Sequence, residues 1–429
     1  MKNFFLFFLF CAFYTTQTIA QASAEGDNIN DNIDEEIELP ESMTYEVDSL
    51  LNTWLAQNYI TTDEECTASN FNPQFSDSVY IDRLSRIPSI MEMPYNDIVK
   101  RFIDLYTNKL RRNVSFMLGA SNFYVPIFEE ALDAYELPDE LKYLPLIESA
   151  LNPSAVSRAG ASGLWQFMLG TGKIYGLESN SLIDERRDPI KSSWAAAKYL
   201  RDLYTIYQDW NLVIAAYNCG PGTINKAIRR ANGAKDYWSI YPYLPRETKG
   251  YVPAFIAANY VMRYYCDHNI CPMDFKLPAN TDTIQVTKDL HFEQISDICG
   301  INVDQIRSLN PQYKRDVVPG HAKPCILRLP RNYVNTFIDS QDTIYTHRAS
   351  ELFNKRKIVA VKETSARRTT SSSSAGKAPS GKAINYKIKD GDTLITIAQQ
   401  YKVKVDDLKR WNNIKGSMIW EGKTLKIYK

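Results

Sequence analysis

Apolar residues recur at helical spacing through most of the chain between residues 78 and 275. In residues 98–106, 126–135 and 192–204 hydrophobic side chains return every three or four positions, with polar side chains between them. A further helix is expected over residues 246–265. No alternating strand pattern interrupts these segments, so we expect a mainly α-helical domain over residues 78–275.

The pattern changes near the C-terminus, where short strands and helices alternate. Strands are expected near residues 386–389 and 424–428, with helices at 393–401 and 405–411 between them. This order predicts a small α+β (βααβ) module over residues 384–429.

The same module is present twice. When the C-terminal segment is moved back by 102 residues, Ile397 falls on Ile295, Leu408 on Ile306, and Trp411-Asn412 on Leu309-Asn310. Residues 280–332 are therefore expected to form a divergent copy, which lacks a counterpart of the turn at residues 391–393.

The composition of residues 333–383 predicts a linker between the two modules. Residues 364–382 consist mainly of Ser, Thr, Ala, Gly and Lys, which cannot bury enough apolar surface to fold. From Lys355 to Lys382 there are eight Lys or Arg and one acid, Glu363. The formal net charge of the whole chain is zero, and no basic folded face is evident, which argues against nucleic acid as a partner.

The first residues have the pattern of a signal peptide, expected at residues 1–24. Lys2 precedes an apolar run at residues 4–13, and small residues follow it. The run is too short to span a membrane comfortably, and no later segment approaches that length. Cys11 leaves a lipid anchor open, although bulky Phe10 precedes it. Residues 25–77 are expected to be an acidic N-terminal segment, because no basic residue occurs between Lys2 and Arg83.

Six cysteines remain after residue 24, an even number that permits disulfides in an exported chain. Cys266 and Cys271 are close enough in sequence to bridge, and Cys299 and Cys325 lie in one module. A zinc site at Cys266, His268 and Cys271 is the weaker reading, because the chain has four histidines and no second cysteine pair. We expect no metal and no cofactor.

Glu148 is the carboxylate best suited to proton transfer. A helix start is expected at Pro138, and Leu141, Leu144 and Glu148 then share one helical face, although Pro145 interrupts the pattern. A carboxyl group on an apolar face is desolvated, which raises its pKa and suits a general acid. On this local pattern alone, a capping or salt-bridged glutamate is the simpler reading.

Three further motifs follow in order. They are Gly163-Leu-Trp-Gln-Phe-Met168, Ala216-Tyr-Asn-Cys-Gly-Pro-Gly222 and Leu244-Pro-Arg-Glu-Thr-Lys-Gly-Tyr-Val-Pro253. With the Glu148 motif, they resemble the lysozyme-like, family-one lytic transglycosylases, especially the membrane-bound lytic murein transglycosylase D branch. Residues 386–427 look like a LysM module. The resemblance implies a lysozyme-like fold for residues 78–275.

What the resemblance implies is cleavage of the β-1,4 bond between N-acetylmuramic acid and N-acetylglucosamine in peptidoglycan. Glu148 would first protonate the leaving oxygen and then act as base on the muramyl 6-hydroxyl, which gives a 1,6-anhydro end. Such a reaction needs one carboxyl group, whereas glycosidases usually need two. By motif match, the residues that would bind substrate or support the carboxylate are Ser157, Gln166, Tyr217, Asn218 and Tyr251.

Each of these residues also has a structural reading. Tyr217 and Tyr251 are typical of core aromatics, and Ser157 of a helix cap. Trp165 and Cys219 are read as packing residues. A hydrolytic muramidase is the alternative enzyme and would need a second carboxylate, for which Asp184, Glu185 and Asp188 are candidates. A non-catalytic wall-binding protein is the alternative of another class.

The resemblance also implies a partner and a location. The LysM-like module would bind the peptidoglycan glycan strands through the turn Gly391, Asp392, Thr393 and Leu394 and the loop at residues 414–420. We expect an exported protein of the periplasm or cell envelope of a Gram-negative-type bacterium, with outer-membrane association left open. The sequence does not indicate the oligomeric state, or whether strand ends or interiors are cleaved.

Overall fold

The computed structural model describes residues 37–46, 50, 60–61, 71–275, 280–353, 383–388, 397–398, 401, 403, 405–412, 414 and 423–428. The chain divides into two compact units, Met1–Glu363 and Thr364–Lys429, which are described separately. The signal peptide, Cys11 and the linker residues 354–382 lie outside the described residues.

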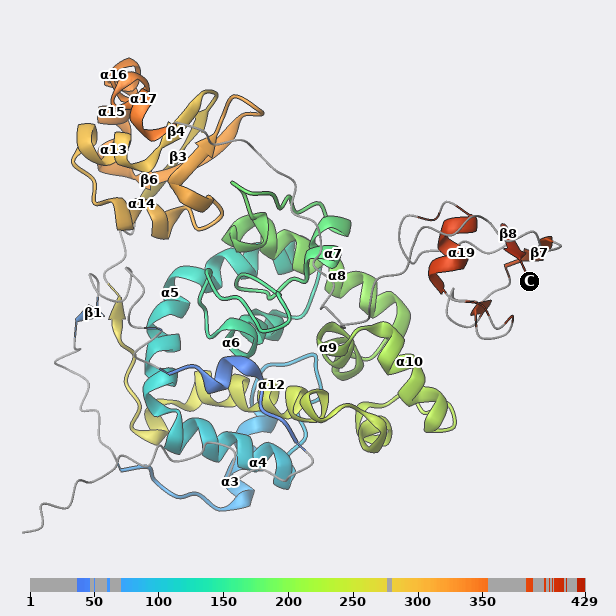
Figure 1. The fold of residues 1–429 in the computed structure, drawn as a ribbon. Helices are drawn as coiled ribbons and strands as arrows, with labels where there is room; N and C mark the ends of the chain where they lie inside the picture. The colour runs from blue at the N-terminus through green and yellow to red at the C-terminus, as the bar shows by residue number, and fades with distance from the viewer. Residues whose placement is uncertain are drawn as a thin grey trace, which may run out of the picture. The chain divides into compact units, whose positions relative to one another are not determined.

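The first unit begins with a helical domain, as the sequence predicts (Figure 1). Its helices are α3 (Asp77–Ser85), α4 (Asp97–Asp104), α5 (Arg111–Asp133), α6 (Leu144–Ser149), α7 (Leu169–Ile174), α8 (Pro189–Tyr207), α9 (Trp210–Cys219), α10 (Pro221–Arg230), α11 (Tyr237–Ile240) and α12 (Arg246–Tyr264). Short turns lie between them: η3 (Leu105–Lys109), η4 (Asp139–Tyr143), η5 (Glu185–Arg187), η6 (Tyr241–Tyr243) and η7 (Cys266–His268).

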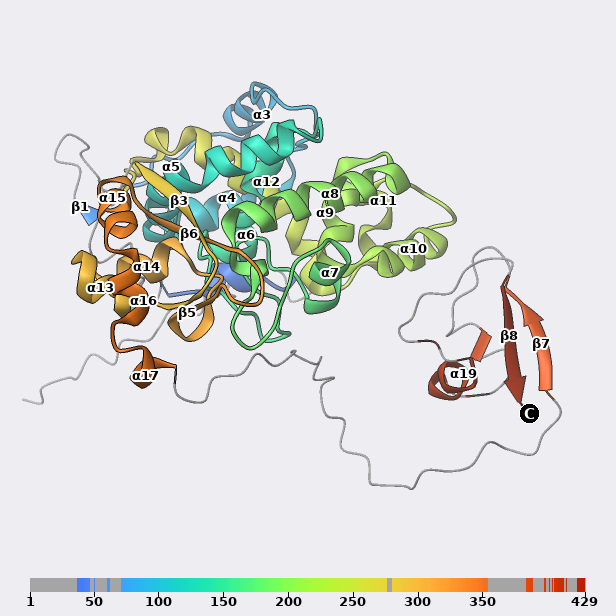
Figure 2. The ribbon, with the colours of Figure 1, turned by 90° about the horizontal axis from the view of Figure 1, so that it is seen from above.

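Helix α12 is the centre of this domain. Every residue from Thr248 to Met262 is buried, and α12 packs against α4, α6 and α9. A helix that is buried on all sides belongs in the interior and not at the surface. The surrounding helices therefore form a shell around α12, which Figures 1 and 2 show from two directions.

The expected helix that leads to Glu148 is broken into two parts. Residues Asp139–Tyr143 form the tight turn η4, and α6 starts afresh at Leu144. Pro145 then lies in the first turn of α6, where a missing N–H costs nothing. Ala150 and Leu151 follow with positive φ angles of 49° and 60°, so the chain turns sharply directly after Glu148.

Part of the acidic N-terminal segment belongs to the helical domain. Leu39 and Met43 are buried in its core, and the turn η2 (Glu41–Thr44) packs on α6. The hydroxyl of Ser42 donates to the carbonyl oxygen of Ile147. Two residues of β1 (Ile60–Thr61) pair antiparallel with β2 (Asp274–Phe275). Residues 37–46 of the expected acidic segment 25–77 thus pack on the helical domain.

The second part of this unit is the βααβ module. Strand β3 (Thr281–Val286) pairs antiparallel with β6 (Cys325–Pro330), and α13 (Phe292–Cys299) and α14 (Val303–Leu309) pack beside them (Figure 2). A second ladder joins β4 (Asp289–His291) to β5 (Val317–Pro319), after the turn η8 (Lys314–Asp316).

The module extends past the boundary expected at residue 332. Residues 331–352 form α15 (Arg331–Asp339), α16 (Gln341–Thr346) and α17 (Ala349–Leu352) instead of the start of a linker. Phe337 and Ile344 are fully buried in the module core. These two apolar side chains explain why the segment folds back on the module.

The second unit contains β7 (Ala383–Lys387), α19 (Val405–Trp411) and β8 (Thr424–Tyr428), and β7 pairs antiparallel with β8. Both modules use the same asparagine contact. Asn310 donates to the carbonyl oxygens of Ile306 and Arg328, and Asn412 donates to those of Leu408 and Lys426. The internal repeat is therefore structural as well as sequential.

Candidate active-site cleft

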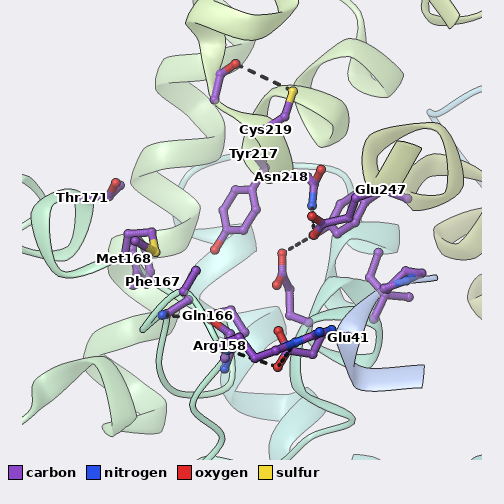
Figure 3. Close-up of a pocket in the computed structure, with 18 of the residues that line it drawn as sticks. Glu41, Arg158, Gln166, Phe167, Met168, Thr171, Tyr217, Asn218, Cys219 and Glu247 are labelled. Carbon is purple, nitrogen blue, oxygen red and sulfur yellow. Dashed lines mark hydrogen bonds and ion pairs between the residues drawn. The ribbon is translucent and has the colours of Figure 1, made fainter. Parts of the chain in front are cut away.

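A cleft of about 540 Å³ opens on the helical domain beside α6, α9 and α12. All six residues that the sequence nominates in this domain line it: Glu148, Ser157, Gln166, Tyr217, Asn218 and Tyr251. Figure 3 shows Tyr217 and Asn218 projecting from α9, with Gln166 on the facing loop and Glu41 beside Arg158 at the other side. The volume suits a small number of sugar rings.

Glu148 lies at the end of α6 with its carboxyl group turned to the cleft. Burial raises its pKa from the ordinary value to about 8, and the negative charge of Glu247 adds to the increase. The hydroxyl of Tyr251 donates a hydrogen bond to Glu148 Oε1 and acts in the opposite direction. Glu148 is thus protonated at neutral pH, as a general acid must be.

Tyr251 is buried on α12 and reaches Glu148 across the helix packing. Burial and the neighbouring Glu148 raise the pKa of the phenol well above its ordinary value. The phenol is therefore protonated at neutral pH and can donate a hydrogen bond. Tyr251 is buried as a core aromatic, and its hydroxyl also contacts Glu148.

The loop of residues 157–168 forms the facing wall of the cleft. Ser157 Oγ accepts from the backbone N–H of Ala161 at 3.0 Å, which stabilises the turn. Gln166 has a positive φ of 46° and donates to the carbonyl oxygen of Gly163 at 2.8 Å, while its buried Oε1 has no hydrogen-bond partner among the described residues. Ser157 is not hydrogen-bonded to Glu148; it faces the cleft from a turn.

Gly163 explains part of the motif on this loop. Its φ is +88°, and a Cβ there would overlap the carbonyl oxygen of Arg186. Glycine is required both for the conformation and for the close approach of two backbones.

Helix α9 supplies the third wall. The hydroxyl of Tyr217 donates to the carbonyl oxygen of Trp165 at 2.7 Å, so this tyrosine ties α9 to the facing loop. Asn218 donates to Glu247 Oε1 at 3.1 Å and accepts from Thr248 Oγ1 at 2.8 Å. Asn218 and Glu247 are thereby fixed relative to each other.

Trp165 and Cys219 behave as the packing reading expects. Trp165 is fully buried, its indole N–H donates to Ser193 Oγ at 2.9 Å, and its ring packs edge-on against Phe128. Cys219 is a free thiol at the rim of the cleft.

The sequence reasoning did not nominate the charged cleft residues Glu38, Glu41, Arg158 and Glu247. Glu247 lies inside the fourth motif and could have been singled out as an acid near the start of a helix. Glu41 reaches the cleft from more than one hundred residues before Glu148, where it accepts from the backbone N–H of Arg158 at 3.2 Å. No sequence pattern announces that contact.

The candidates for a second carboxylate lie elsewhere. Asp184 is bonded to Arg186, Glu185 to Lys191, and Asp188 caps the first turn of α8 through the N–H groups of residues 190 and 191. None of the three lines the cleft.

The structure also describes most of the cysteines and His268. Cys266, Cys299 and Cys325 are free thiols, whereas Cys271 is disulfide-bonded, so neither pairing suggested by sequence proximity forms. Both ring nitrogens of His268 are hydrogen-bonded, to Asn72 and Tyr260, which removes it from a zinc site with its neighbours. Across the described ranges, no group of three His, Cys, Asp or Glu is placed to hold a metal ion.

The expected glycan-binding turn and the membrane-spanning potential of the chain concern regions that the structure describes in part or not at all. Gly391, Asp392, Thr393 and Leu394 lie outside the described residues, so their glycan contacts stay a prediction. Among the helices that the structure describes, none is both long enough and apolar enough to cross a membrane.

Comparison with known protein families matches three parts of the chain. Residues 126–240 match the Transglycosylase SLT domain, residues 280–346 the LysM-like domain of lytic transglycosylase MltD, and residues 386–427 the LysM domain. The membrane-bound lytic murein transglycosylase D of Escherichia coli is 30% identical over 349 residues, which cover 79% of this chain and 70% of that protein. The chain belongs to the membrane-bound lytic murein transglycosylase D family.

Other lytic transglycosylases match shorter stretches of this chain. The soluble lytic murein transglycosylase of Escherichia coli is 30% identical over 149 residues, 33% of this chain and 23% of that one. Membrane-bound lytic murein transglycosylase F of Maricaulis maris is 35% identical over 154 residues, 33% and 29% of the two chains. A solved structure of the soluble Escherichia coli enzyme matches 35% of this chain and 26% of its own, with 28% identity and a TM-score of 0.30.

The protein is therefore a peptidoglycan lytic transglycosylase with a mainly helical catalytic domain and two small C-terminal modules.

Proposed function

We propose that Glu148 is the single acid and base of a reaction that cleaves the β-1,4 bond between N-acetylmuramic acid and N-acetylglucosamine. The protonated carboxyl donates its proton to the leaving glycosidic oxygen. The carboxylate then accepts the proton of the muramyl 6-hydroxyl, whose oxygen bonds to the anomeric carbon and closes the 1,6-anhydro ring. The bond is broken without water, so the enzyme is a carbon–oxygen lyase.

The observation that carries this proposal is the pKa of Glu148, raised to about 8 by burial in the cleft. A group with this pKa is a competent acid at neutral pH and, once ionised, a stronger base than an ordinary carboxylate. Tyr251 keeps the ionised form from becoming too unstable, because its hydroxyl donates to Oε1. The intramolecular hydroxyl needs no second carboxylate to activate it, since it is held at high effective concentration.

The other cleft residues then have separate tasks. Gln166 Oε1, which is buried without a partner among the described residues, accepts from a sugar hydroxyl or an N-acetyl N–H. Ser157 offers a hydroxyl to the substrate from the same wall. Tyr217 and Asn218 hold the walls together through the carbonyl oxygen of Trp165 and the side chain of Glu247.

A muramidase is the alternative within the same cleft. Asp184, Glu185 and Asp188 are absent from the lining, so its second carboxylate would have to be another acid of the cleft, Glu38, Glu41 or Glu247. The structure favours the one-carboxylate reaction, since none of the nominated partners for hydrolysis faces Glu148.

The decisive experiment is digestion of purified sacculi by the wild type and by Glu148→Gln, read by mass spectrometry. The wild type should release muropeptides whose ends are one water lighter than reducing ends, and Glu148→Gln should release none while still binding sacculi. Glu130→Gln is the matched control, because it makes the same change at an exposed position of α5 that does not line the cleft, and it should retain activity. Reducing ends from the wild type would establish hydrolysis, and full activity of Glu148→Gln would establish a different catalytic group.

The C-terminal LysM module is the proposed anchor to glycan strands, through residues 391–394 and the loop at 414–420. The substrate and the signal-like first 24 residues place the protein in the cell envelope, in the periplasm of a Gram-negative-type bacterium. Outer-membrane attachment through Cys11 would be detected as a lipid-modified N-terminal peptide.

A further inference from the structure

The central βααβ module shares a segment of chain with the catalytic domain. Ile183 belongs to the catalytic domain in sequence, yet it is buried in the module core and forms a β-bridge with Tyr313. The N–H of Asp184 donates to the carbonyl oxygen of Gln312 at 2.8 Å, and the N–H of Lys314 donates to that of Leu182 at 2.6 Å. Residues 182–184 are therefore held by residues 312–314 through both backbones.

Asp184, which takes part in this backbone contact, also forms a buried ion pair with Arg186. Asp184 accepts from Nε and Nη2 of Arg186, both at 2.8 Å, and Lys314 Nζ approaches Asp184 Oδ2 to 3.6 Å from the module. Burial alone would raise the pKa of Asp184, but the bonds from Arg186 and the charge of Lys314 bring it below its ordinary value. A buried carboxylate in this position depends on both cations.

The remaining nitrogen of Arg186 reaches the cleft wall. Its Nη1 donates to the carbonyl oxygen of Gly160 at 2.9 Å and to that of Phe167 at 3.0 Å. These two carbonyl groups lie within the loop of residues 157–168, which carries Ser157 and Gln166. One guanidinium group thus connects two points of the cleft loop to the segment that the module holds.

The internal repeat makes this contact informative. In the C-terminal module the expected glycan-binding segments are residues 391–394 and 414–420, and the offset of 102 places their counterparts at 289–292 and 312–318. In the central module β4 at 289–291 is paired with β5 at 317–319, and residues 312–314 contact the catalytic domain. The counterparts of both sugar-binding segments are thus occupied by contacts within the protein.

We propose that the module of residues 280–346 is a brace for the catalytic cleft and not a glycan-binding module, with Lys314 and Arg186 as positioning residues. Lys314 and the backbone of residues 312–314 fix Asp184, Asp184 fixes Arg186, and Arg186 fixes the loop that carries Ser157 and Gln166. The catalytic consequence rests on the proposed function of the cleft; the contacts themselves do not.

The test is a charge reversal on the module side, Lys314→Glu, in the full-length protein. Lys314 is partly exposed, so the change leaves the cores intact while it places a negative charge beside Asp184. Weakened anchoring of Arg186 should lower kcat on sacculi about 10-fold, because small displacements of a substrate-positioning wall have large effects on rate. Binding to sacculi should be unchanged, and deuterium uptake of residues 157–168 should increase.

Two variants serve as controls. Arg331→Glu makes the same charge reversal on the module at the start of α15, which packs on β3, β6, α13 and α16, and should leave kcat and deuterium uptake unaltered. Lys314→Arg retains the cation and should preserve the wild-type rate. If Lys314→Glu does not fold, Lys314→Met removes the charge without adding another.

Wild-type kcat and unaltered uptake in Lys314→Glu or Lys314→Met would overturn the brace. Loss of sacculus binding with retained kcat would instead identify the module as a glycan binder. Deuterium uptake of residues 157–168 can be measured without turnover, so it tests the brace even if Glu148→Gln disproves the proposed function.

Discussion

The contact between Tyr251 and Glu148 gives a quantitative prediction for the pH dependence of the enzyme. Burial raises the pKa of Glu148 to about 8, while the hydrogen bond from Tyr251 lowers it from the value that burial alone would give. Since the protonated form is the active acid, kcat/KM should be constant below this pKa and fall as pH rises through about 8. A one-carboxylate reaction adds no acidic limb from a second ionised carboxylate.

Tyr251→Phe removes the donor and keeps the ring. A hydrogen bond to a charged group contributes about 1.5–3 kcal/mol, and one pKa unit corresponds to about 1.4 kcal/mol, so the descending limb should move up by about 1 to 2 pH units. Glu247→Gln should move the limb in the opposite direction, because a negative charge that raises the pKa is removed. That shift should be smaller, since the charge of Glu247 is the weakest of the three influences on Glu148.

The assay is the rate of release of soluble muropeptides between about pH 3 and about pH 10, fitted as kcat/KM for the three proteins on one batch of sacculi. The position of the limb is compared and not the absolute rate, because Tyr251 can contribute to catalysis in other ways. A limb in Tyr251→Phe that stays in place or moves to lower pH would refute the electrostatic reasoning. A bell-shaped wild-type profile with an acidic limb near pH 4, about the pKa of an ordinary carboxylate, would favour the muramidase.

Three further predictions concern stability. Gly163→Ala should lower the free energy of unfolding by more than about 2 kcal/mol, because the new Cβ overlaps the backbone of Arg186. Gly160 has a similar φ but open space around it, so Gly160→Ala should lower the free energy of unfolding by about 1 kcal/mol. Urea titration compares the two variants. Trp165→Phe should lower the melting temperature, because it leaves a cavity and removes a hydrogen bond worth about 1–3 kcal/mol. The apparent KM should be unchanged. A raised KM would instead mean that the indole holds the cleft wall in the position that binds the sugar. Burial lowers the pKa of His268 to about 4, so the unfolded chain binds a proton at a higher pH than the folded chain, and the free energy of unfolding falls as pH drops from about 6.5 to 4. The difference in free energy of unfolding between wild type and His268→Gln should therefore shrink over that interval. A constant difference would contradict this prediction.

The sequence predicted the helices of the catalytic domain more accurately than it predicted the boundaries between domains. Helical periodicity predicted the helices of residues 98–106 and 192–204, and the structure has α4 and α8 there. It also predicted α19 and β8 at the correct residues. The expected end of the central module at residue 332 was wrong, because α15 belongs to the module through the buried side chain of Phe337 and not through a periodic sequence pattern.

The candidate site divides in the same way. Ordered motifs identified six residues of one cleft, because each motif keeps its reactive group at a fixed place on a local element. They could not identify Glu41, which reaches the cleft only because residues 37–46 pack beside α6. Nor could they exclude Asp184, whose role depends on Arg186 and on a module more than one hundred residues away.

By itself the sequence determined the helical class, the repeated module and the family resemblance, and it nominated Glu148 as the reactive glutamate, since these follow from local spacing and residue chemistry. Only the tertiary structure decided which carboxylates face the cleft, which cysteines remain free, and what the central module contacts. Those features arise from burial and from hydrogen bonds between distant segments. The same physics sets the pKa of Glu148, because desolvation is a property of the folded cleft and not of the residue.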